Sequence, residues 1–315
     1  MSDRKSTLDT VAVVSLVVCC ALWGINQVAI KLALAEVPPL MQAAVRSLGA
    51  AVLVFAWSAW RGITLWRRDG TLAGGAVAGA LFAAEFGCIF VGLQFTGASR
   101  MAVFIYLAPF VVALGMPFIA RAERLAPLQI AGLFAAFAGV AYALAEGLTR
   151  PAIGPLQWLG DCLGVAAAVL WGATTLAIRG TALGRAVAEK TLLYQLAISG
   201  LLLALAVPFA GEPWPERISL ATVALLLFQT VIVTFASYLL WFWLIAHYPA
   251  TPLAAFTLLT PVFGLLAGTL ILDEPVTMRL VIALAAVSAG IYIVNRPPAW
   301  RGLRPASKGT RQSAD

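Results

Sequence analysis

Two residues of opposite charge, Glu85 and Arg46, lie within long apolar stretches of the sequence. A charged side chain inside a bilayer is costly unless it has a partner, so each needs an explanation. At 1.5 Å of rise per helical residue, both fall about 12 to 14 Å from the same end of their helices. Either Glu85 receives a substrate ammonium or a proton while Arg46 holds a carboxylate or tunes Glu85, or the two form a buried ion pair without contact to substrate.

Uncharged polar and aromatic residues near these positions could complete a binding site. Asn26 and Gln27 have Thr174 and Thr175 at matching places 148 residues later. These side chains predict a shared cavity wall, although hydrogen bonds between helices would explain them equally well. Aromatic rings could stack on an apolar or aromatic ligand, or pack in the core or at the membrane interface. The remaining candidates for substrate binding are Trp23, Tyr106, Trp171, Tyr238, Trp241 and Ser237, which lies 152 residues after Glu85.

Three further residues are expected to shape helices. Pro109 and Pro261 fall near the middle of two apolar stretches, where a proline removes a backbone donor and frees a carbonyl of the preceding turn. We predict that each is a hinge beside the cavity, with a simple packing kink as the alternative. Asp161 follows Gly160 near the start of an apolar stretch, where an acidic group favours a helix N-terminus.

The composition predicts the elements that must position these residues. Of 315 residues, 62% are apolar and only 11% are charged, with a mean hydropathy of +0.93. A membrane-spanning helix needs about 20 mostly apolar residues, and this composition excludes a soluble globular protein. Breaks at charges, prolines and glycines predict an all-α integral membrane protein with ten transmembrane helices. The expected spans are 9–31, 38–60, 72–94, 98–120, 126–146, 155–179, 187–209, 219–246, 250–272 and 276–296.

The basic residues predict the orientation of these spans. Most of the 21 Lys and Arg residues lie in alternate loops and near both termini, which the positive-inside rule places in the cytoplasm. We expect a multi-pass protein of the bacterial inner membrane, in contact with membrane lipid. The same distribution explains the net charge of +7 without nucleic acid as a partner. Residues 297–315 form a basic tail that we expect to be disordered. The basic residues of the opposite side are Lys31, Arg100, Arg150, Arg217 and Arg279.

The chain contains an internal repeat. Leu22-Trp23-Gly24 recurs as Leu170-Trp171-Gly172, and residues of the run from Ala98 to Pro109 recur between Ala250 and Pro261. The sequence thus predicts two five-helix repeats, residues 1–150 and 151–296. Because five is odd, the second repeat must cross the membrane in the opposite orientation. Inverted repeats are the basis of many secondary transporters, because exchanging the conformations of the halves opens a central site to either side.

These motifs resemble the EamA-type carriers of the drug/metabolite transporter superfamily. The resemblance rests on the tryptophan motif of each repeat, the runs that end at Pro109 and Pro261, and the E-R-L-x-x-x-Q-x-x-G run from Glu123 to Gly132. The length and the ten-span layout are similar to the YddG type of amino-acid exporter. The resemblance implies a basket-like bundle with a central cavity between the two halves, which exports small metabolites.

We therefore expect a secondary transporter that exports neutral or aromatic amino acids by alternating access, with a broad drug or lipid-precursor exporter as the alternative. An enzyme is not expected, because Ser199 and His247 would lie too far apart for an intramembrane serine protease. The single histidine excludes multi-histidine metal sites, and we expect no cofactor. Proton coupling stays open. The small residues Gly75 to Gly79 could join helices within one chain or between two, so we expect a monomer or a weak homodimer.

Overall fold

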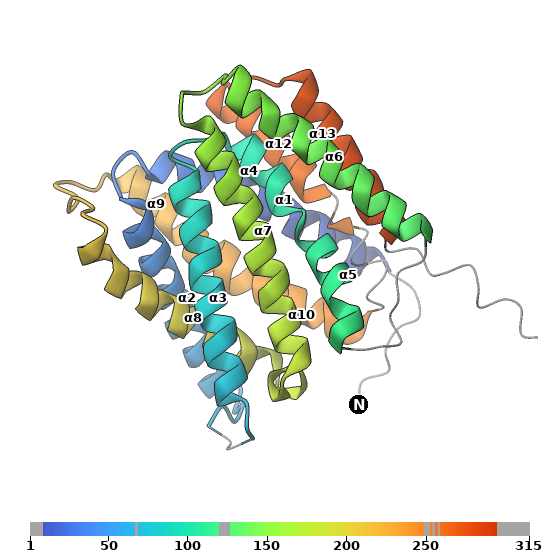
Figure 1. The fold of residues 1–315 in the computed structure, drawn as a ribbon. Helices are drawn as coiled ribbons and strands as arrows, with labels where there is room; N and C mark the ends of the chain where they lie inside the picture. Colours follow the sequence, from blue (N-terminus) through green and yellow to red (C-terminus); the bar gives the residue numbers. More distant parts are fainter. Residues whose placement is uncertain are drawn as a thin grey trace, which may run out of the picture.

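The computed structural model describes residues 9–66, 69–119, 127–248, 253, 256–257 and 259–294, all of whose regular structure is helical (Figure 1). The predicted tail 297–315 and Glu123 lie outside these residues. The main helices are α1 (Thr10–Ala33), α2 (Pro39–Trp60), α3 (Leu72–Gly92), α4 (Ala98–Ile105), α5 (Ala108–Ile119), α6 (Pro127–Thr149), α7 (Gln157–Gly180), α8 (Ala188–Ala206), α9 (Leu220–Leu227), α10 (Tyr238–His247), α12 (Leu259–Leu272) and α13 (Met278–Val294). Shorter segments are η1 (Ala182–Arg185), η2 (Val207–Phe209) and the π-helix η3 (Phe228–Ser237).

The helices agree with the expected membrane-spanning segments. Within the described residues, seven helical segments are long and apolar enough to cross a membrane, and three shorter apolar helices accompany them. The shorter ones cover Ile130–Ala143, Leu259–Leu272 and Met278–Ile293. The chain is therefore an all-helical membrane protein of about ten spans.

The fourth predicted span is not one continuous α-helix. It separates into α4 and α5 at Tyr106 and Leu107, whose N–H groups donate to the carbonyls of Val103 and Phe104 in two tight turns. Pro109 is the second residue of α5. An N–H group at this position has no partner within the helix, so its absence in proline breaks no intrahelical hydrogen bond. Pro261 is likewise the third residue of α12. Each proline thus lies in the first turn of a helix, at the matching span of each half.

Helices of the first half pack mainly against helices of the second. The α1 helix packs against α12, α2 against α8, and α3 against both α7 and α8. At one edge of the bundle α6 and α13 run side by side (Figure 1), with Gly132 and Gly290 at their contact. Gly75 and Gly79 lie against Tyr194 and Ile198 of α8. These small residues therefore join helices within one chain.

Replacing Gly24 with alanine is expected to destabilise the contact between α1 and α12. A Cβ at Gly24 would lie 2.6 Å from the backbone nitrogen of Gly264, so the two helices must separate. Such overpacking costs about 1–3 kcal/mol, and the melting temperature in detergent should fall accordingly. Gly154→Ala is the matched control, because nothing lies within 4 Å of its added Cβ. Equal melting temperatures for the two variants would contradict the close approach.

Candidate functional site

Arg46 on α2 is completely buried and has unused hydrogen-bonding capacity. Its guanidinium lies over the ring of Phe86, 3.8 Å from the ring centre, and 5.2 Å from that of Phe90. None of its three side-chain nitrogens makes a hydrogen bond of standard geometry. Glu85 and Tyr238 are close enough to interact with it electrostatically. Arg46 is thus a buried cation held by aromatic rings, with the hydroxyl of Tyr238 within reach and no hydrogen bond of standard geometry.

Glu85 on α3 provides the opposite charge. Its side chain is 4% exposed, and its Oε2 atom has no hydrogen-bond partner. Although Glu85 and Arg46 interact electrostatically, no hydrogen bond joins them. A buried, hydrogen-bonded ion pair would satisfy both groups. Here each charge keeps capacity that a zwitterionic ligand could use.

Aromatic residues predicted from the sequence come together beside these charges. Trp23 donates from Nε1 to the hydroxyl of Ser237 over 2.9 Å. The ring of Trp23 meets those of Tyr238 and Trp241 edge to face, with centres 6.4 Å and 5.4 Å apart. Since Tyr238 also interacts with Arg46 and Glu85, the rings and the two charges form one group.

The break between α4 and α5 joins this group through a second aromatic pair. Tyr106 is buried and meets Trp171 of α7 edge to face, with ring centres 5.8 Å apart. Tyr106 also lies within interaction range of Tyr238 and of Thr260 on α12. The hydroxyl of Thr260 makes no hydrogen bond of standard geometry. We call Trp23, Arg46, Glu85, Tyr106, Trp171, Ser237, Tyr238, Trp241 and Thr260 the central cluster. Both halves of the chain contribute to it.

The four polar residues that follow the tryptophans behave differently in the two halves. Thr174 and Thr175 donate to the carbonyls of Leu170 and Trp171 one turn earlier in α7, so their hydroxyls are used within their own helix. Asn26 Oδ1 and Gln27 Oε1 of α1 are buried without a hydrogen-bond partner. Asn26 and Gln27 therefore keep the capacity to bind a ligand, whereas the threonines are already satisfied.

The π-helix η3 could not be recognised in the apolar pattern. It ends at Ser237, directly before Tyr238, and Thr234 donates to the carbonyl of Gln229 five residues earlier. Segments with this wider turn are rare and are frequent at functional sites. Gln229 also donates to Gln42 of α2 over 2.9 Å. The segment thus presents Ser237 and Tyr238 to the central cluster while its other end is tied to the first half.

The sequence did not predict a buried charge cluster, because Arg100 was counted among the basic residues of the outer side and Asp161 was placed near a helix N-terminus. Asp161 lies in the second turn of α7, and its two oxygens accept from Arg100 Nε and Nη2 at 3.0 and 2.6 Å. Arg100 Nη1 donates to Glu146 over 3.0 Å, and Thr277 donates to the same carboxylate over 2.7 Å. This cluster ties α4, α6 and α7 together. Both oxygens of Asp161 already accept hydrogen bonds, so Asp161 is not available to a ligand.

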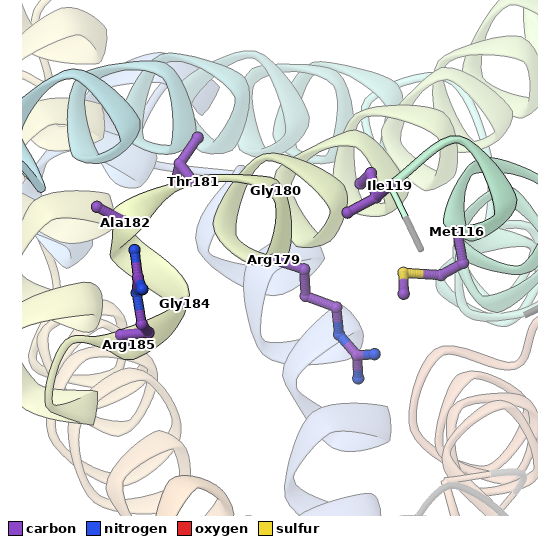
Figure 2. Close-up of a pocket in the computed structure, with 8 residues that line it drawn as sticks. All are labelled: Met116, Ile119, Arg179, Gly180, Thr181, Ala182, Gly184 and Arg185. Carbon is purple, nitrogen blue, oxygen red and sulfur yellow. The ribbon is translucent and has the colours of Figure 1, made fainter. Parts of the chain in front are cut away.

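A separate pocket of about 610 Å³ opens at the end of α5 and α7. Figure 2 shows the side chains of Arg179 and Met116 reaching into the space between the two helices. The remaining lining residues are Ile119, Gly180, Thr181, Ala182, Gly184 and Arg185. None belongs to the central cluster. The pocket is therefore distinct from the group of charges and aromatic rings.

At the same end of the bundle, the α2–α3 loop contacts the start of α8. Hydrogen bonds from Thr71 and the ammonium group of Lys190 hold the pKa of Asp69 down to about 2. Lys190 Nζ lies 2.9 Å from Asp69 Oδ2. Because Asp69 is partly exposed, this bridge contributes little to stability.

Ionisable residues buried within membrane-spanning helices commonly mark the pathway of a substrate or an ion. The comparison with protein families makes this specific. Residues 10–145 and 158–296 each match the model of the EamA-like transporter family, so the chain belongs to that family and carries two copies of its domain. The expected membership of the drug/metabolite transporter superfamily is confirmed, and the protein is a transporter and not an enzyme.

Relatives extend over nearly the whole chain. A transporter of Bacillus subtilis named YvbV, of uncharacterised function, is 27% identical over 87% of this chain and 88% of its own length. A protein of Escherichia coli named a probable amino-acid metabolite efflux pump is 25% identical over 96% of this chain and 98% of its own. A solved crystal structure superposes with a TM-score of 0.63 at 21% identity, covering 90% of this chain and 97% of the other, which shows the shared fold.

Proposed function

We propose that this transporter exports neutral or aromatic amino acids across the bacterial inner membrane. The observation that carries the proposal is the pair of buried opposite charges, Arg46 and Glu85, whose unused donors and acceptor lie beside aromatic rings. The relation to a probable amino-acid metabolite efflux pump of Escherichia coli supports the same substrate class.

The chemistry of the central cluster fits a zwitterion. Arg46 would hold the carboxylate through charge-assisted hydrogen bonds, and Glu85 would accept the ammonium group. Trp23, Tyr238 and Trp171 would contact an apolar or aromatic side chain. The central cluster offers one cation and one anion, so a substrate with several negative charges would leave most of its charge unmatched.

The packing of the helices supports an inverted repeat that works by alternating access. In three contacts, a span of the first half packs against the equivalent span of the second half. These contacts are α2 with α8, α4 with α12, and α6 with α13. The contact of α1 with α12 is mirrored by that of α7 with α4. A two-fold relation between halves of opposite orientation produces such pairs, and Pro109 and Pro261 would be equivalent hinges. The distribution of basic residues supports a cytoplasmic position for both termini.

Transport by purified protein in liposomes tests the proposal. Labelled phenylalanine, tryptophan, leucine and threonine should enter vesicles in a saturable manner and compete with one another. An imposed pH gradient then decides whether protons are coupled. Empty liposomes and liposomes with the Glu85→Gln variant are the controls. Absence of uptake for all four, with folded and inserted protein, would reject amino acids and favour a broad drug or lipid-precursor exporter.

A further inference from the structure

Three glutamates in loops at one end of the bundle each accept hydrogen bonds from the start of a helix of the other half. Glu212, between η2 and α9, accepts from the N–H groups of Leu40 and Met41 at 2.9 and 3.2 Å. These two residues follow Pro39 in the first turn of α2. The carboxylate therefore satisfies two N–H groups that the helix cannot pair internally.

Glu36 makes the reciprocal contact from the first half to the second. Its Oε2 accepts from the backbone N–H of Ser219 over 2.6 Å, and Ser219 is the N-cap of α9. This hydrogen bond holds the pKa of Glu36 below its ordinary value. Glu212 and Glu36 thus bridge the same two loops in opposite directions.

Glu274 makes the third contact, from the α12–α13 loop to the start of α4. Its two oxygens accept from the N–H groups of Ala98 and Ser99 at 2.7 and 2.9 Å. Lys31 of α1 lies 3.4 Å from the same carboxylate. A negative charge at a helix N-terminus is favourable, and bonds to an ionised acceptor are strong. All three carboxylates lie at the end of the bundle predicted to face outward.

The opposite end of the bundle differs at the repeat counterpart of Lys31 within the described part of the chain. Arg179 is the repeat counterpart of Lys31, but it lines the open pocket of about 610 Å³ (Figure 2) and forms no ion pair with a described residue. Asp69 and Lys190 bridge the halves there, at a partly exposed site. The outer end also has a pocket, of about 290 Å³, which Lys31 and Glu274 help to line. Among the described residues, the two ends therefore differ in the ion pair of Lys31 and not in openness.

We infer that Glu36, Glu212 and Glu274 form the outer gate of the transporter, and that the structure shows it closed. The inference rests on the proposed alternating access. Opening the outer end separates the two halves, and every one of these bonds joins a loop of one half to a helix start of the other. Release of the three carboxylates from α2, α4 and α9 is therefore the step that opens the site outward.

The distance across the outer end tests the gate directly. Spin labels at Gln94 and Arg217, exposed positions in outer loops of different halves, are introduced as cysteines after the four native cysteines are replaced. The Glu36→Gln, Glu212→Gln and Glu274→Gln triple variant keeps side-chain volume and removes the charges. Pulsed electron paramagnetic resonance measures the distance between the two spin labels. In most molecules of the triple variant this distance should be longer than in the parent protein. If the triple variant does not fold, the Glu212→Gln, Glu274→Gln double variant is compared with the parent protein in the same way.

Glu216→Gln is the matched control, because this exposed carboxylate in the same loop as Glu212 contacts no helix start. Its distance distribution should equal that of the parent. An unchanged distribution in the folded triple variant would overturn the gate, as would an equal shift in the control. Since the measurement needs no substrate, failure of amino-acid uptake together with a shifted distance would reject the proposed substrate and leave the gate standing.

Discussion

Replacing Asp161 with asparagine is expected to lower the free energy of unfolding by about 3 kcal/mol, at the low end of the cost of breaking a buried ion pair. Asp161 is fully buried and holds Arg100 through two hydrogen bonds. Glu146 remains as a partner for Arg100 in the variant, which limits the loss. Denaturant-induced unfolding in detergent micelles measures the difference.

Glu216→Gln removes an exposed carboxylate and should change the free energy of unfolding by less than about 0.5 kcal/mol. The Asp161 result would contradict the structure if it fell within the same small range. Because the cluster makes no contact with the central charges, uptake by the folded fraction of Asp161→Asn should keep its apparent substrate affinity.

Replacing Arg46 with glutamine is expected to weaken transport without unfolding the protein. Hydrogen bonds to charged groups contribute about 1.5–3 kcal/mol, so the apparent KM for a labelled amino acid should rise roughly ten- to a hundredfold. Arg46→Lys keeps the charge but loses the planar fork, and should fall between wild type and Arg46→Gln. Initial rates of uptake into liposomes over a range of substrate concentrations give these values.

The same variants separate the two roles considered for Arg46 and Glu85. If the pair were mainly structural, Arg46→Gln would destabilise the protein strongly by leaving Glu85 uncompensated. If Arg46 awaits a substrate, its burial without hydrogen bonds is itself costly, and its removal should leave the melting temperature equal or higher. Arg61→Gln, at the exposed end of α2, is the control for loss of a positive charge. Wild-type transport by folded Arg46→Gln would remove Arg46 from the site.

Much of the fold and part of the site could be predicted from the sequence. Apolar stretches predict the helices because length and hydropathy decide what a bilayer accepts. Trp23, Ser237 and Tyr238 were each candidates for substrate binding in the sequence, and the structure brings them into contact. Thr174 and Thr175 could not be judged in this way, because a hydroxyl that bonds its own helix and one that faces a cavity look the same in a sequence.

Other features depend on contacts between distant residues. Arg100 and Asp161 lie 61 positions apart. The charge count placed Arg100 on the outer side, at the start of the expected span 98–120, and gave no sign of its buried partner. The bonds from Glu212 to α2 span more than 170 residues. The spacing of the apolar residues in η3 does not predict its widened turn. In each case the partner, and not the residue type, determines the role.

The cluster of Arg100, Asp161 and Glu146 has no equivalent at the repeat-related positions of the chain. The positions that correspond to them by the repeat offsets are occupied by Pro252, Val13 and Pro297. Exchanging the conformations of the two halves therefore cannot reproduce these bonds at the other side of the membrane. The two end states of such an exchange are chemically unequal and differ in energy, so the resting population is uneven before any substrate or ion gradient acts on it.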